Sequence, residues 1–142
     1  MTELDRALVQ RKLATITRNL ADLAPIAALS AAEYASDRLR RKAVERLLQE
    51  VIEAAVDANL HLLRALNVDL PNDYYTTFMA IGRHEVVTLA LAERLAPAAG
   101  LRNRLVHEYD DIDDGIVLGA VGRGCRDFAE YVAAVEQYLL QR

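Results

Sequence analysis

The chain has 142 residues, of which 53% are hydrophobic and 27% are charged, and its formal net charge is −4. This is the composition of a globular protein with one domain over residues 1–142, and no uncharged apolar run of about 18 residues occurs that would cross a membrane. The acidic balance argues against a broad nucleic-acid-binding surface, so a nuclease on this scaffold would need a local basic cleft. Cys125 is the single cysteine. No internal disulfide can form, and a cytoplasmic location is expected.

Apolar residues at helical spacing dominate the first half of the chain. Leucines and isoleucines recur over residues 2–23 and predict a first helix, which Pro25 interrupts. Ser30 with Glu33 three places on has the pattern of a capping box, which marks another helix start. A long helix is expected from about residue 36 to residue 66, with an apolar stripe wide enough for burial on more than one side.

A basic cluster, Arg38-Leu39-Arg40-Arg41-Lys42, lies near the start of this long helix. Lysine and arginine neutralise phosphates, so the cluster is a candidate surface for steering RNA. Charged runs on helices are more often solvated faces, and that interpretation is favoured here.

The second half of the chain predicts shorter helices followed by a long one. An aromatic helix is expected over residues 72–81, ended by Gly82, and another runs from residue 84 or 85 to residue 95. Pro97 then bends the path, and a final helix is expected over residues 113–140. The whole pattern predicts an all-α, single-domain antiparallel bundle of about five helices, four of them long.

The segment Leu101-Arg102-Asn103-Arg104-Leu105-Val106-His107-Glu108-Tyr109 combines two guanidiniums, a carboxamide, an imidazole and a phenol. Its apolar residues have helical spacing, and Pro97 can begin a separate helix for it. On a helix, Asn103 and His107 share one face, whereas Arg102 and His107 lie about 140° apart around the axis. Convergence of that pair needs a distorted helix end, a long reach by Arg102, or a second copy of the chain across a two-fold axis.

Histidine and arginine together suit the cleavage of a phosphodiester. Imidazole titrates near neutrality, so it can take a proton from an attacking hydroxyl or give one to the leaving oxygen. Guanidinium stays charged and presents a planar fork to phosphate oxygens, including the added charge of the transition state. In RNA the 2′-hydroxyl of the substrate can be the attacking group. Cations at a helix C-terminus also favour the helix dipole, and on spacing alone that interpretation is the stronger one.

Arg102, the four residues after it, His107, Glu108 and Tyr109 resemble the R-x4-H-x-Y signature of HepT-type toxins of the HEPN superfamily. The helical pattern resembles that family over nearly the whole chain. The resemblance implies a homodimeric, metal-independent endoribonuclease that acts as the toxin of a toxin–antitoxin pair. Its partner would be a minimal nucleotidyltransferase (MntA-like) antitoxin, which in that family can transfer AMP to the tyrosine of the signature, here Tyr109.

The resemblance also implies roles for individual residues. His107 is expected to transfer protons, Arg102 to stabilise phosphate charge, and Asn103 to orient the imidazole or the phosphate. Arg104 is a candidate RNA-binding residue, and Tyr109 is the expected AMPylation site. Arg102 is expected to be exposed at the helix end, so that its removal spares the fold. The site is expected at or near the interface of a homodimer, with RNA as substrate and with no cofactor, metal, membrane or DNA.

The sequence has two other interpretations, a metal site and a binding function without catalysis. The acidic run Asp110-Asp111-Ile112-Asp113-Asp114 suggests a metal loop, but a calcium loop aligned on Gly115 puts Ile112 and Val121 at ligand positions and therefore fails. Acidic residues at a turn are mostly solvated, and no pair of histidines has zinc-ligand spacing. The alternative function is a non-catalytic helical dimer that binds a nucleotidyltransferase or another partner through the signature. The acidic net charge favours that alternative.

Overall fold

The computed structural model describes residues 4–107 and 112–142, and within these ranges the chain forms helices joined by turns and short connections. The prediction of an all-α fold is confirmed. No helix in the described residues is long and apolar enough to cross a membrane. The elements in chain order are α1 (Arg6–Leu23), the 3-10 turn η1 (Ile26–Ala28), α2 (Ala31–Ala35), α3 (Arg38–Ala65), α4 (Tyr74–Arg83), α5 (Leu89–Leu95), α6 (Ala98–His107) and α7 (Asp114–Leu140).

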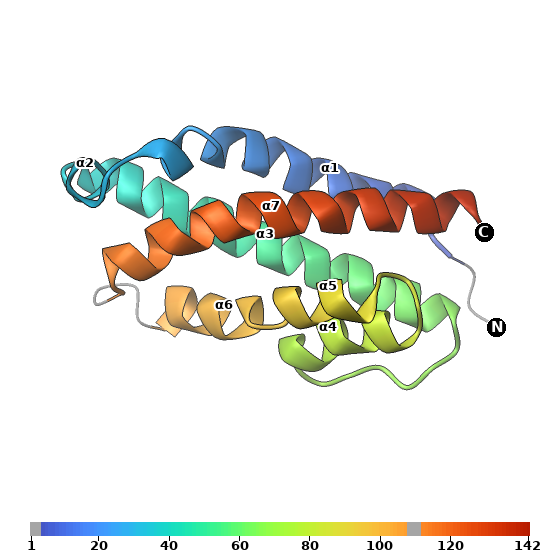
Figure 1. Cartoon of the computed structure of the whole chain (residues 1–142). Coiled ribbons are helices and arrows are strands. Elements are labelled where there is room, and N and C mark those ends of the chain that lie inside the picture. The colour runs from blue at the N-terminus through green and yellow to red at the C-terminus, as the bar shows by residue number, and fades with distance from the viewer. Residues whose placement is uncertain (1–3, 108–111) are drawn as a thin grey trace.

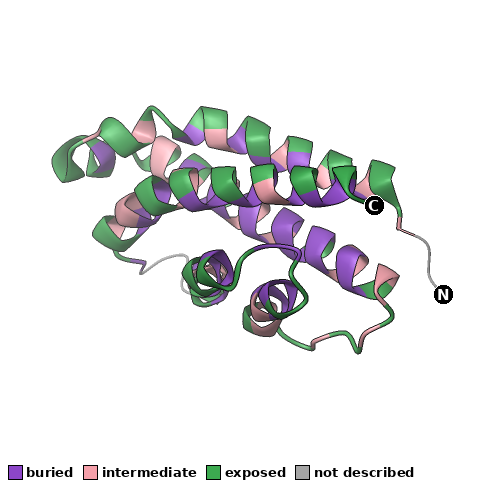
Figure 2. Cartoon of the chain, turned by 45° about the vertical axis from the view of Figure 1, so that its right-hand side comes forward, coloured by how far each residue is buried: buried purple, intermediate pink, exposed green. Residues whose placement is uncertain are grey.

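The bundle consists of four helical paths whose axes are roughly aligned (Figure 1). The long helices α1, α3 and α7 each follow one path, and the shorter helices α5 and α6 follow the fourth, one after the other, with α4 beside α5. α1 packs along α3 and α7, while α4 and α6 pack on α3 from the other side. These consecutive paths run antiparallel, as predicted, whereas α4 runs antiparallel to its neighbour α5 in a helical hairpin. α3 lies at the centre. Figure 2 shows the consequence: buried residues line the faces between the helices, and exposed residues line the outside.

Polar side chains cap the helix starts. Ser30 and Glu33 form the predicted capping box, in which the Ser30 hydroxyl accepts from the Glu33 N–H at 3.1 Å and the Glu33 carboxylate accepts from the Ser30 N–H at 2.9 Å. Asp37 caps α3, whose bounds agree closely with the predicted long helix. α1 begins after an Asp5 cap, later than predicted, and Thr2 at the predicted start lies outside the described residues.

The end of α4 differs from the prediction. Gly82, which was expected to end this helix, lies inside it, because α4 continues to Arg83 and His84 forms the C-cap. Gly82 is needed for the packing of α4 against α5 and does not end the helix. A Cβ at Gly82 would lie 2.5 Å from the Cβ of Ala92 on α5. The missing side chain therefore lets α4 and α5 approach closely.

The start of α5 also differs from the prediction, which placed it at residue 84 or 85. Glu85 has a φ of 61°, in the left-handed region that a helix interior does not accept. The cap is Thr88, whose hydroxyl accepts from the Leu91 N–H at 3.1 Å. Val86 and Val87, which gave the segment its helical spacing, are buried in the turn before the helix.

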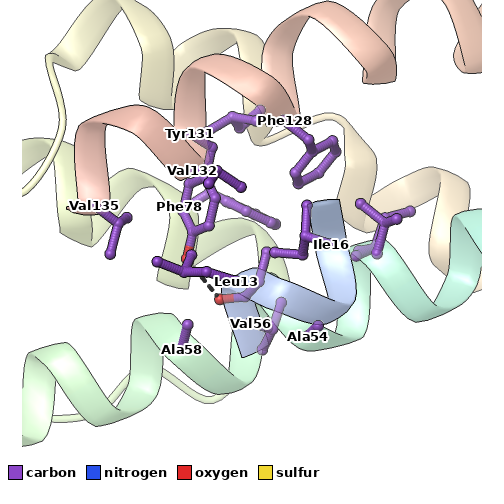
Figure 3. Packing of buried hydrophobic residues seen from close by; sticks show 14 of the residues in the cluster. Leu13, Ile16, Ala54, Val56, Ala58, Phe78, Phe128, Tyr131, Val132 and Val135 are labelled. Carbon is purple, nitrogen blue, oxygen red and sulfur yellow. Dashed lines mark hydrogen bonds between the residues drawn. The ribbon is translucent and has the colours of Figure 1, made fainter. Parts of the chain in front are cut away.

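The core is organised around three aromatic rings from α4 and α7 (Figure 3). Phe128 packs edge-to-face on both Phe78 and Tyr131, with ring centroids 6.2 Å apart in each pair. The fully buried Tyr131 hydroxyl lies 3.1 Å from the carbonyl oxygen of Ala55 and 2.6 Å from Oδ1 of Asn59. A hydroxyl has one proton and can donate to only one of these oxygens. Turning the Asn59 amide by 180° would place its Nδ2, which has no partner, against the hydroxyl oxygen.

The two ends of the bundle differ in what they contain. At one end, Arg6 at the start of α1 donates hydrogen bonds to the carbonyl oxygens of Leu139 in the last turn of α7 and of Arg142 after it. At the opposite end lie the C-terminus of α6, at His107, and the start of α7 (Figure 1). The predicted functional segment is thus far from both described chain ends.

Candidate active site

The predicted functional segment forms its own helix, as Pro97 suggested. α6 begins directly after this proline, whose missing N–H is tolerated in a first turn, and it ends at His107. Ala99 and Leu105 are buried and anchor the helix on the core, whereas Asn103 and His107 are exposed. The helix therefore presents an amide and an imidazole on its outer side, in agreement with their spacing of four residues.

Arg102 points into the molecule. Its side chain is only 24% exposed, so the prediction of an exposed arginine is wrong. Its Nε and Nη2 lie 3.0 and 2.9 Å from Oε2 of Glu53 on α3, and its guanidinium carbon lies 4.8 Å from the ring centre of Tyr74 on α4. Both partners come from distant parts of the chain, which local spacing does not reveal. No local sequence pattern singles out Glu53, since acidic residues also stand between buried neighbours elsewhere on α3, as Asp57 does.

Arg102 and His107 do not meet within one chain. The Arg102 side chain is directed to Glu53 and Tyr74, whereas His107 is exposed, in agreement with their separation of about 140° on a helix. α6 is a regular helix through His107, so its end is not distorted. The long side chain of Arg102 extends to Glu53 and not toward His107. Of the three routes to convergence, a second copy of the chain is the one that this arrangement leaves open.

Arg104 lies near the same end of α6. It lines a hollow of about 290 Å³ between α6 and α7, together with Leu101, Ile116 and the exposed Arg123. Two guanidiniums at one hollow give this acidic chain a local basic feature within one helical turn of His107. Larger hollows of about 610 and 630 Å³ lie between α1 and α7 and beside the turn before α5, and no residue of α6 lines either of them.

The connection between α6 and α7 is described only in part. Glu108, Tyr109, Asp110 and Asp111 lie outside the described residues, so the predicted AMPylation site is among them. Asp113 caps α7 by accepting from two backbone N–H groups at 2.7 and 3.1 Å. Within residues 4–107 and 112–142, no group of three or more His, Cys, Asp or Glu side chains is arranged to hold a metal ion.

The basic cluster at the start of α3 is used for contacts within the chain. Arg41 pairs with Asp114 at the start of α7, at 3.5 Å, and Arg40 donates to the carbonyl oxygen of Glu33 on α2. Lys42 pairs with Glu45 at 3.6 Å. Three of the four charges therefore help to tie α3 to its neighbours or to its own next turn, which neither sequence interpretation of the cluster predicted.

Comparison with known proteins identifies the family. A family model described as ribonuclease HepT-like matches residues 16–135. The chain belongs to the HepT-like family. The matched range contains the whole of α6 and the signature, so the family expected from the signature is confirmed.

Two relatives match this HepT-like protein over nearly its full length. The tRNA nuclease HepT of Aphanizomenon flos-aquae is 35% identical over 140 residues, which cover 99% of this chain and 95% of that protein. The mRNA nuclease HepT of Shewanella oneidensis is 24% identical over 129 residues, which cover 91% of this chain and 96% of that protein.

A solved structure shows the same fold. It is a tri-AMPylated HEPN toxin of Shewanella oneidensis in complex with an MNT antitoxin, and it superposes on 92% of this chain and 97% of its own with a TM-score of 0.82. At 24% sequence identity this likeness is evidence of fold alone, and it confirms the predicted HEPN-like helical bundle.

Proposed function

We propose that this HepT-like protein is a metal-independent endoribonuclease and the toxin of a two-component toxin–antitoxin system. One observation supports the assignment to particular residues. Arg102 of α6 is held by Glu53 on α3 and Tyr74 on α4, and Asn103 and His107 lie on the exposed side of α6. Those are the residue types that phosphodiester cleavage needs, and the ribonuclease family model covers all of them.

In the proposed reaction, the 2′-hydroxyl of the RNA attacks the adjacent phosphorus. The bond between O2′ and phosphorus forms while the bond between phosphorus and O5′ breaks, which leaves a 2′,3′-cyclic phosphate and a 5′-hydroxyl. His107 transfers the proton that leaves the 2′-hydroxyl or the proton that arrives at O5′. Arg102 balances the charge on the phosphate in the transition state, and Asn103 orients the imidazole or the phosphate.

The complete site is proposed to form at or near the interface of a homodimer. Within one chain the guanidinium of Arg102 faces α3 and α4 while His107 faces outward, so a second copy can supply the missing partner for each. A two-fold axis duplicates every such contact. Arg104 and the hollow that it lines are the proposed contacts to the RNA backbone.

The proposed partner is an MntA-like nucleotidyltransferase antitoxin, with both proteins acting in the cytoplasm. The similar Shewanella oneidensis toxin is itself AMPylated and bound to an MNT antitoxin, which supports this assignment. The antitoxin would join the Tyr109 oxygen to the α-phosphorus of ATP and release pyrophosphate. An AMP group two residues from His107 would place a negative charge where the RNA phosphate has to bind.

The catalytic assignment is tested with purified protein and total RNA in EDTA. Wild-type protein should cleave RNA and leave 5′-hydroxyl ends, whereas His107→Ala should lose cleavage with an unchanged melting temperature, because the imidazole is exposed. His84→Ala is the matched control, since His84 is also exposed and also lies at a helix C-terminus. Cleavage by His107→Ala, or no cleavage in EDTA by the wild type, contradicts the proposal. Absence of cleavage with tight binding of the antitoxin would favour the non-catalytic dimer.

The regulatory assignment has a separate test. Incubation with the antitoxin and ATP should add one or more AMP groups to the intact mass and should stop cleavage. Tyr109→Phe should block both effects while the nuclease stays active. Modification that persists in Tyr109→Phe would show that the acceptor is another residue.

A further inference from the structure

A carboxylate outside the signature holds the arginine of the signature. Glu53 lies in the middle of α3, where its neighbours Ile52 and Ala54 are buried in the core, so its backbone is firmly placed. Its side chain is 29% exposed and turns toward α6. Oε2 accepts from Nε of Arg102 at 3.0 Å and lies 2.9 Å from Nη2 of the same guanidinium. Gln49, one turn earlier on α3, also donates to this oxygen, at 3.3 Å, and keeps the carboxylate in place.

The ring of Tyr74 supplies the second contact. Tyr74 is the first residue of α4, and the cap formed by Asp73, which accepts from the Thr76 N–H at 2.8 Å, fixes the start of that helix. The guanidinium carbon of Arg102 lies 4.8 Å from the ring centre, within the range of a cation–π contact. One edge of the guanidinium is therefore held by Glu53 and one face by Tyr74. The Nη1 nitrogen has no hydrogen-bond partner among the described residues and is left for a phosphate oxygen.

We propose that Glu53 is a positioning residue of the ribonuclease site, which acts by fixing the direction in which Arg102 presents its guanidinium to the phosphate. This inference rests on the proposed ribonuclease function. Arginine has a long side chain with high rotamer entropy, and a guanidinium that is free to move must be ordered again at each catalytic cycle. The hydrogen bond from Arg102 to Glu53 on α3 orders the guanidinium before the RNA binds.

Removal of the Glu53 carboxylate should have opposite effects on RNA cleavage, depending on whether its positioning of Arg102 or its negative charge matters more. Glu53 carries a negative charge next to the cation that binds phosphate, so charge alone predicts that Glu53→Ala binds RNA more tightly and cleaves it at least as fast. Positioning predicts slower chemistry with binding preserved. A misplaced catalytic group can cost about a hundredfold in rate, so we expect kcat to fall by about ten- to a hundredfold while KM is unchanged or lower.

Two further variants separate positioning from a general structural effect. Glu53→Gln keeps an oxygen that can accept from Nε of Arg102, so it should recover most of the lost kcat. Asp57→Ala is the matched control, because it removes a carboxylate one turn further along α3 that pairs with Lys12 at 3.0 Å and has no role at α6. It should keep the wild-type kcat. If Glu53→Gln is as slow as Glu53→Ala, or if Asp57→Ala is equally slow, the positioning role is overturned.

A spectroscopic readout does not depend on activity. In the wild type, the Nε–H of Arg102 should give its own resonance in a nitrogen–proton spectrum, because it is bonded to Glu53. Arg102→Ala identifies this resonance, which should disappear or merge with those of solvated arginines in Glu53→Ala.

The same assays separate failure of this inference from failure of the proposed function. Cleavage by Arg102→Ala would remove Arg102 from the proposed site. Loss of cleavage in Arg102→Ala together with a wild-type kcat in Glu53→Ala would overturn only the role of Glu53.

Discussion

Gly82→Ala tests whether close packing of α4 and α5 outweighs helix propensity. Alanine is favoured over glycine inside a helix by about 1 kcal/mol, so local preference predicts a more stable protein. The new Cβ, however, would lie 2.5 Å from the Cβ of Ala92 and 3.4 Å from the Cα of Leu89. Carbon atoms pack at about 3.5–4.0 Å, so α5 has to move away by roughly 1 Å. Neither Cβ can rotate out of the contact, because each is fixed to its backbone.

Overpacking of this kind costs about 1–3 kcal/mol, and we place this site in the upper part of that range. After the gain in propensity, the free energy of unfolding should fall by about 1–2 kcal/mol, which lowers Tm by roughly 3–7 °C in a chain of this length. Urea and thermal unfolding at one fixed protein concentration measure both quantities, since a dimer makes stability depend on concentration.

Gly124→Ala in α7 is the matched control. The nearest atoms to its new Cβ, on Leu48 and Phe128, would lie at an ordinary 3.9 Å, so propensity should dominate and Tm should rise by a few degrees. An equal rise of Tm in Gly82→Ala and Gly124→Ala would refute the steric argument.

Two other predictions concern polar groups of α7. Tyr131→Phe removes a fully buried hydroxyl that is bonded to Ala55 and Asn59, and should lower the free energy of unfolding by about 1–3 kcal/mol in urea; an unchanged midpoint would contradict the assigned bonds. The hydrogen bond from Arg94 holds the pKa of Glu130 below its ordinary 4.5, so the folded protein binds this proton less tightly than the unfolded chain does. The stabilisation is therefore present above pH 4.5 and is lost as the pH falls through the lowered pKa. The stability difference between wild type and Glu130→Gln should shrink from pH 7 to pH 3, and a constant difference would contradict the linkage.

The parts of the fold that sequence predicts well are those set by neighbouring residues. Ser30 and Glu33 cap each other across three residues, and the apolar stripe of α3 marks its own length, so both were predictable from local patterns. Gly82 was misjudged because its role depends on Ala92, ten positions away on another helix. The late start of α5 was missed because the positive φ of Glu85 belongs to a tight turn and not to the apolar pattern around it.

The same division holds for the candidate site. The shared exposed side of Asn103 and His107 follows from their helical spacing, and so does the separation of His107 from Arg102. The contact between Arg102 and Glu53 spans 49 positions and joins two helices, so no local rule could place it.

The hydrogen bonds from Arg6 to the carbonyl oxygens of Leu139 and Arg142 have a practical use. Because both described ends lie together, far from the end of α6, an affinity tag or a surface linker attached at either of them would point away from His107 (Figure 1). Immobilised protein would then keep its histidine side open to solution, so RNA and antitoxin could be tested in turn on one captured sample.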